Sequence, residues 1–200
     1  IAIGAGGLDV AVAMATGTYY LQCPSVVKVN LVGKKAKWAS AKDVILYILQ
    51  QLSVKGGVNK IVEYTGEGLK ELSLTDRATI CNMGAELGAT TSVFPTDEIT
   101  KEYLIQQGRE EDYVELKADE DATYDEEITV DLSKLVPLTA KPHSPDAVVP
   151  VSELRGMKIN QVVIGSCTNS SLPDMLKAAK ILKGRRVATH VSLVIAPGSS

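Results

Sequence analysis

The chain has 200 residues, of which 45% are hydrophobic and 22% charged, so it can bury a sizeable core as one large domain or two small ones. A net charge of -3 and an aromatic content of 4% provide neither the basic surface nor the stacking platforms that favour nucleic-acid binding. No apolar run approaches the roughly 20 residues of a membrane span.

The cysteines lie far apart, at Cys23, Cys81 and Cys167. An odd number at irregular spacing does not indicate a disulfide framework. A reducing compartment therefore fits the chain best.

The chain opens with an expected strand at residues 1–3, a glycine turn at 4–7 and a helix over 8–15. This order is typical of a dinucleotide-binding turn, but Asp9 stands where the third glycine of G-x-G-x-x-G is needed. We therefore favour a tight turn with close backbone packing over a nucleotide site.

A strand–helix–strand rhythm follows. Alternating apolar residues predict a strand over 26–32, and Ser40 is placed as the N-cap of a helix over 41–52. A short strand is expected at 60–64. This rhythm predicts βαβ units, an α/β fold and a mainly parallel sheet.

The next helix is expected to begin at residues 74–76 and to end near Gly88. Asn82 and Glu86 are four positions apart, so they would project together from one face of this helix. On these residues alone a solvated face is the favoured interpretation, and a functional pair is the alternative. Gly84, inside the helix, indicates a close approach of another element. A short strand at 89–94 and a helix at 98–107 complete this part.

Residues 110–127 are acidic and poor in large apolar side chains, which indicates a solvated surface segment. A strand is predicted over 128–132, followed by a proline-rich connection in which His143 is interpreted as a turn residue. The last unit is a strand at 161–164, a polar turn around Cys167, a helix at 174–182 and a strand at 189–195. A cysteine at a helix N-terminus is biased towards thiolate, so Cys167 is either a reactive or metal-binding thiol or a structural one.

Several segments together resemble the aconitase family, which includes the large subunit of 3-isopropylmalate dehydratase and homoaconitase. The most specific is Gly165-Ser166-Cys167-Thr168-Asn169-Ser170. The other matching segments, in the family's order, are residues 3–7, 41–46, 62–66, 78–86 and 88–95.

The resemblance implies a [4Fe-4S] cluster with Cys167 as one ligand and Ser166 and Asn169 around it. The other two ligands would come from a Cys-x-x-Cys further downstream, while Cys23 and Cys81 match no ligand position. It also implies active-site roles for Asn82 and Glu86, which favours the functional interpretation of that pair. The family's catalytic serine and substrate-binding arginines match no position in this chain.

The family's architecture implies three-layer α/β/α domains with mainly parallel sheets. We expect residues 1–24 to be the tail of a first domain, 25–136 a second, and 137–200 the start of a third. The abrupt ends suggest a piece of a longer polypeptide that is inactive by itself and whose remaining domains are its partners.

The implied function is aconitate hydratase, acting on a small tricarboxylate substrate, and the turn at residues 4–7 and the sequence Met83-Gly84-Ala85-Glu86 favour it. The alternative is 3-isopropylmalate or homoaconitate dehydratase, whose pattern the segment 142–146 resembles. A third possibility is an RNA-binding regulator without a cluster, which the acidic balance of the chain disfavours.

Overall fold

The computed structural model describes residues 6–20, 22–165, 168 and 170–198. The chain divides into two compact units, Ile1–Val151 and Ser152–Ser200. The expected strand at residues 1–3 lies outside the described residues, and the helix after it is confirmed as α1 (Gly7–Thr16). The domain limits expected near residues 24 and 136 stay predictions.

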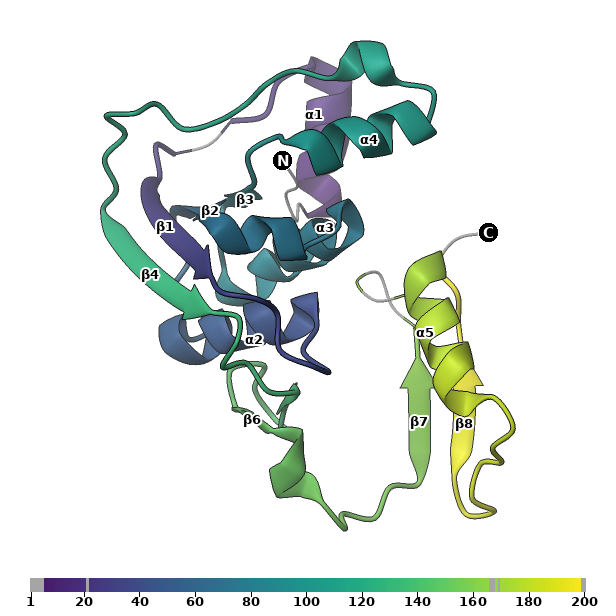
Figure 1. The fold of residues 1–200 in the computed structure, drawn as a ribbon. Helices are drawn as coiled ribbons and strands as arrows, with labels where there is room; N and C mark the ends of the chain where they lie inside the picture. Colours follow the sequence, from purple (N-terminus) through teal and green to yellow (C-terminus); the bar gives the residue numbers. More distant parts are fainter. Residues whose placement is uncertain (1–5, 21, 166–167, 169, 199–200) are drawn as a thin grey trace. The chain divides into compact units, whose positions relative to one another are not determined.

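A four-stranded parallel sheet organises the first unit (Figure 1). Its order is β3 (Thr91–Val93), β2 (Lys60–Thr65), β1 (Ser25–Val32) and β4 (Glu126–Asp131). In the central strand β1, alternate residues are fully buried, namely Val27, Val29 and Leu31. The period-2 pattern in the sequence therefore marks the core face of the sheet.

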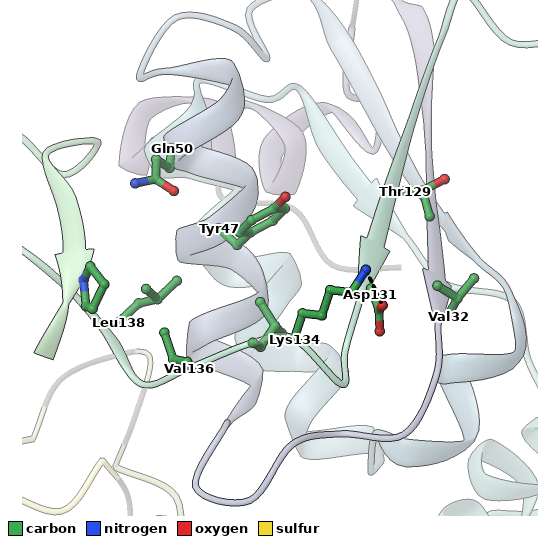
Figure 2. A pocket seen from close by; sticks show the side chains of 10 residues that line it. Val32, Tyr47, Gln50, Thr129, Asp131, Lys134, Val136 and Leu138 are labelled. Carbon is green, nitrogen blue, oxygen red and sulfur yellow. Dashed lines mark ion pairs between the residues drawn. The ribbon is translucent and has the colours of Figure 1, made fainter. Parts of the chain in front are cut away.

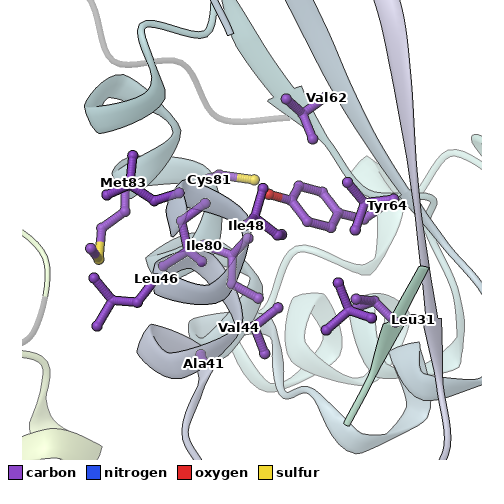
Figure 3. Packing of buried hydrophobic residues seen from close by; sticks show 14 of the residues in the cluster. Leu31, Ala41, Val44, Leu46, Ile48, Val62, Tyr64, Ile80, Cys81 and Met83 are labelled. Atoms are coloured by element: carbon purple, nitrogen blue, oxygen red, sulfur yellow. The ribbon is translucent and has the colours of Figure 1, made fainter. Parts of the chain in front are cut away.

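Two helices supply the other side of this core, α2 (Ala41–Leu52) and α3 (Leu74–Met83). Figure 3 shows their apolar side chains packed towards Leu31, Val62 and Tyr64 of the sheet. The Tyr64 ring stacks on Phe94 with centroids 4.4 Å apart. The predicted α/β class with mainly parallel strands is confirmed.

Asp43 explains where α2 begins. Its carboxylate accepts a hydrogen bond from the Ser40 backbone N–H at 2.6 Å, so an aspartate fills the place that a glutamate or glutamine takes in many capping boxes. The other carboxylate oxygen accepts a bond from Leu138 N–H at 2.6 Å. One buried side chain therefore starts the helix and holds the hairpin of β5 (Leu138–Ala140) and β6 (Val148–Pro150) against it.

Short helices complete the first unit. They are η1 (Glu67–Glu71), η2 (Gly84–Leu87), α4 (Glu98–Gln106) and η3 (Glu110–Asp112), and η4 (Val151–Leu154) follows at the division between units. Glu110–Asp112 forms the only helix within the acidic stretch predicted to be a solvated segment, among the residues that the structure describes.

The second unit is a single βαβ element. The strands β7 (Gln161–Ile164) and β8 (Ser192–Ile195) pair in parallel and are joined by α5 (Leu172–Leu182). In the pairing of β7 with β8, Val163 lies opposite Val194. Among the described residues of this unit, Ser170 alone is buried.

Candidate functional site

The turn between β7 and α5 is held at both of its ends. Gly165 follows β7 with φ +147°, and a Cβ atom there would lie 2.2 Å from the carbonyl oxygen of Ala196. The Ala196 N–H donates to Ile164 O at 2.8 Å. Since only glycine tolerates this approach and this φ, Gly165 fixes how the chain leaves the strand.

The far end of the turn packs against the segment after β8. Ser170 is 4% exposed, and its carbonyl oxygen accepts a hydrogen bond from Gly198 N–H at 3.1 Å. Ser171 occupies the N-cap position of α5, and its Oγ donates to the side chain of Asp174 at Oδ2, at 2.7 Å. The predicted site residues Ser166, Cys167 and Asn169 lie between these fixed points but outside the described residues.

Two other predicted site residues, Asn82 and Glu86, lie in the first unit, where α3 ends. The predicted helix does not run uniformly to Gly88, because the α-helix stops at Met83 and continues as the 3-10 helix η2. Asn82 therefore lies in the last turn of α3 and Glu86 in η2, and the two do not share one regular α-helical face. Both residues are exposed.

Glu86 lines a pocket of about 410 Å³ between α2, η2 and β5. Lys42 supplies a cation to the same pocket, and Leu46, Met83 and Leu138 contribute an apolar wall. The arrangement suits a small anionic ligand that also has an alkyl part, since a positive, a negative and an apolar surface converge. Lys42 lies within a segment that matches the family, but the sequence analysis did not single it out.

The start of α3 is fixed by two capping interactions. Ser73 is the N-cap, and the Asp76 carboxylate accepts a bond from Ser73 N–H at 3.1 Å while Asp76 N–H donates back to Ser73 Oγ at 3.2 Å. This reciprocal pair satisfies two backbone donors and sets the first residue of the helix.

A buried arginine, Arg77, joins α3 to α4. Its side chain is 3% exposed and makes two hydrogen bonds to the Asp97 carboxylate, at 3.0 and 2.5 Å. Asp97 is in turn the N-cap of α4 and accepts a bond from Thr100 N–H at 3.1 Å. Sequence analysis missed this pair. The available signal was a charged residue three positions before Ile80, on the buried stripe of the helix.

A larger pocket of about 560 Å³ lies where β1 and β4 end (Figure 2). It is mostly apolar, and an ion pair joins Lys134 Nζ to Asp131 Oδ2 at 3.2 Å. The Ser133 hydroxyl and backbone N–H lower the pKa of Asp131. The strand order reverses between β1 and β4, and ligands of open α/β sheets often bind at such a point. Of the predicted site residues that the structure describes, neither Asn82 nor Glu86 lines this pocket.

The cysteines of the first unit differ in their environment. Cys81 is buried and its thiol donates to Ser92 O at 3.7 Å, whereas Cys23 is exposed. Within the described part of the chain, no group of three or more His, Cys, Asp or Glu side chains could hold a metal ion. Nor does any helix of that part have the length and apolar character needed to cross a membrane.

A [4Fe-4S] cluster is held by cysteine thiolates, so each cysteine of this chain can be judged by whether its surroundings would let it bind iron. Cys81 is excluded from such a role by its place in the core, between α3 and β3. The turn after β7 suits one thiolate, because it opens at a helix N-terminus and is anchored on both sides. The described residues on either side of position 167 are compatible with one ligand of a cluster there, and the ligand role of Cys167 stays a prediction.

Comparison with known proteins shows which family the chain resembles. Residues 1–200 match the model of the "Aconitase family (aconitate hydratase)". The chain is 45% identical over 196 residues to the 3-isopropylmalate dehydratase large subunit 2 of Archaeoglobus fulgidus, covering 98% of this chain and 47% of the relative. It is 46% identical to the 3-isopropylmalate dehydratase large subunit of Caldicellulosiruptor saccharolyticus and 44% identical to that of Clostridium kluyveri. Each of these matches covers 98% of this chain and 46% of the relative.

These relatives carry the name of the alternative function rather than that of aconitate hydratase. The chain spans about half the length of the curated relatives that it matches. The family match covers every residue, and the segments at α3, at β3 and at the turn after β7 all fall inside it. The chain belongs to the aconitase family.

Proposed function

We propose that the polypeptide containing this chain is a hydro-lyase of the 3-isopropylmalate dehydratase type and acts as its large subunit. The observation that supports this most is the 45% identity over 98% of the chain to a relative of that name. The name "large subunit" implies a second, smaller chain, which we propose as a partner together with the remaining domains of the same polypeptide.

Cys167 is proposed as one of three cysteine ligands of a [4Fe-4S] cluster, with Ser166 and Asn169 beside it. The bound cluster would supply a Lewis acid for the oxygen atoms of the substrate. The contribution of this chain is to hold the thiolate, since the turn is fixed by Gly165 before it and by Ser170 after it. A ligand on a fixed turn loses little conformational freedom when it binds.

Glu86 and Asn82 are proposed as the polar groups that orient the substrate. An exposed carboxylate can accept a hydrogen bond from a substrate hydroxyl or from the water that is lost and regained. The amide of Asn82 can donate to an oxygen and accept from a hydroxyl. Lys42, in the same pocket as Glu86, would pair with a substrate carboxylate.

The pocket beside Glu86 also supports the choice of substrate class. A 3-isopropylmalate molecule has two carboxylates and a branched alkyl group, whereas citrate has three carboxylates and no alkyl branch. Leu46, Met83 and Leu138 offer an apolar wall that a branched alkyl group can cover. Aconitate hydratase remains the second candidate, because Met83-Gly84-Ala85-Glu86 favours it in the sequence.

A substrate comparison tests this proposal. The full-length protein would be produced anaerobically with its small subunit, reconstituted with iron and sulfide, and given 3-isopropylmalate or citrate. Ultraviolet absorbance follows the unsaturated product. We expect at least about a 100-fold higher kcat/KM for 3-isopropylmalate, since a missing or extra buried carboxylate is poorly tolerated. A preference for citrate, or tight RNA binding without turnover, would overturn it.

A further inference from the structure

The transition from α3 to η2 is built on a close contact between Gly84 and Ser92. Gly84 is buried, and a Cβ atom on it would lie 2.6 Å from Ser92 Oγ. The next atoms are much further away, with Ser92 Cβ at 3.8 Å and Ala89 Cβ at 3.9 Å. The hydroxyl oxygen is therefore the single obstacle to a side chain at position 84.

Backbone strain does not explain the glycine. Gly84 has φ -57° and ψ -26°, a right-handed helical conformation that alanine adopts freely. Alanine is also the better helix former of the two. The requirement for glycine thus comes from its neighbour across the core.

Ser92 itself is held rigidly. It is 1% exposed and lies in β3, where it pairs with Val62 of β2. Its carbonyl oxygen accepts a bond from the Cys81 thiol in α3. Its Oγ is buried beside the hydroxyl of Tyr64.

The turn that follows is tied to the same place. Gly84 O accepts a bond from Ala89 N–H at 3.1 Å, and Ala85 O accepts one from Gly88 N–H at 3.0 Å. Glu86 lies inside this closed turn, and Asn82 lies one turn before it. A shift of Gly84 relative to β3 would therefore move both side chains.

We propose that Ser92 is a positioning residue: its hydroxyl acts as a steric stop against Gly84 and thereby sets where Glu86 and Asn82 lie. The inference rests on the proposed function for its effect on catalysis. The contact itself is a property of the first unit alone and can be tested separately.

A double-mutant cycle tests whether the Ser92 hydroxyl acts as a steric stop. It compares wild type, Gly84→Ala, Ser92→Ala and the double variant in the full-length, cluster-loaded enzyme with its small subunit. We expect Gly84→Ala to lower kcat by about 10- to 100-fold with a smaller change in KM, because a displacement near 1 Å costs that much in rate. Ser92→Ala should also lower kcat, by about 3- to 10-fold, because Gly84 then has no stop. The double variant should regain most of the lost kcat, since the Cβ added at position 84 fills the space of the missing Oγ and meets its next atom only at 3.8 Å.

Hydrogen exchange of residues 84–89 separates the possible failures. We expect reduced protection in Gly84→Ala and restored protection in the double variant, whether or not the enzyme turns over 3-isopropylmalate. A double variant as impaired and as unprotected as Gly84→Ala would exclude Ser92 as the stop. A wild-type enzyme without hydro-lyase activity, but with this exchange pattern intact, would overturn the proposed function and leave the steric contact standing.

Discussion

The side chains of Glu86 and Lys42 place a negative and a positive charge in the same pocket. They come from η2 and α2, more than forty positions apart, and share an apolar wall. Opposite charges that line the same concave surface provide one acceptor and one anion-binding group. Their usefulness depends on the backbone that carries them, and for Glu86 that backbone is the turn held by Gly84 and Ser92.

The proposed ligand Cys167 leads to a prediction about the thiols. In the full-length protein, Cys167→Ser should lose the visible absorption of the cluster, its iron content and the activity together, because an alcohol is a poor replacement for a thiolate ligand. Cys23→Ser is the matched control, since Cys23 is exposed and proposed to have no ligand role. Retention of full iron content in Cys167→Ser would refute the ligand assignment.

Among the elements, the connection between α3 and α4 depends on a single ion pair. Asp97→Asn keeps the N-cap of α4 but leaves the Arg77 charge buried without a counter-charge. We expect a loss of about 3 kcal/mol in the local free energy of opening, measured by hydrogen exchange in the first turn of α4. The control Asp112→Asn removes an exposed ion pair with Arg109 and should cost less than about 1 kcal/mol.

The same pair gives α4 a defined dependence on pH. Partial burial alone would raise the pKa of Asp97, but the hydrogen bonds from Arg77 and Thr100 outweigh it and lower the pKa below the ordinary 3.8. The stabilisation is then complete above pH 3.8 and is lost as the pH falls through the lower value of the folded state. Exchange protection of α4, corrected for the intrinsic rate, should fall in this acidic range in wild type. If Asp97→Asn showed the same fall, another group would be responsible.

Local patterns predicted most elements, because period-2 alternation, apolar helical stripes and capping residues act over a few positions. This holds for β1, for α2 and for β7. The change from α-helix to 3-10 helix after Met83 was not predicted, because the apolar positions Ile80, Met83 and Leu87 continue through both elements. Arg77 was missed because its partner lies twenty positions away.

The choice of substrate was also beyond the sequence motifs. The motifs at residues 4–7 and 83–86 favoured aconitate hydratase, whereas similarity along the whole chain leads to relatives named 3-isopropylmalate dehydratase. A few residues near the proposed site reflect the chemistry that family members share. Substrate choice depends on all the protein surfaces that surround the substrate. About half of each relative lies outside the matched part, so this chain supplies only some of those surfaces.

On the scale of the whole molecule, the second unit requires other parts of the polypeptide. A two-stranded sheet with one helix is at most marginally stable, and uninterrupted apolar strands are typical of sheets covered on both faces. Val163 and Val194 pair across β7 and β8 and are 60% and 44% exposed in this unit. We infer that further segments of the same polypeptide cover them.

This inference predicts a large effect from one surface substitution. Val163→Asp in the full-length protein should lower its thermal stability or its yield of folded protein strongly, since a buried unpaired carboxylate costs several kcal/mol. Gln161→Asp, at the start of the same strand, exchanges one polar side chain for another; it is the control and should cost much less. If Val163→Asp were as mild as this control, the face of β7 around Val163 would be open to water.

The pairing of β1 with β4 has a consequence for synthesis. Lys28 of β1 meets Glu127 of β4 across 99 positions of sequence. At about 5–20 residues per second, a ribosome needs roughly 5–20 s to produce that interval. During this time one edge of the central strand β1 has no neighbouring strand to pair with. The nascent chain is then most exposed to mispairing with other chains, so the late arrival of β4 sets when this unit becomes safe from aggregation.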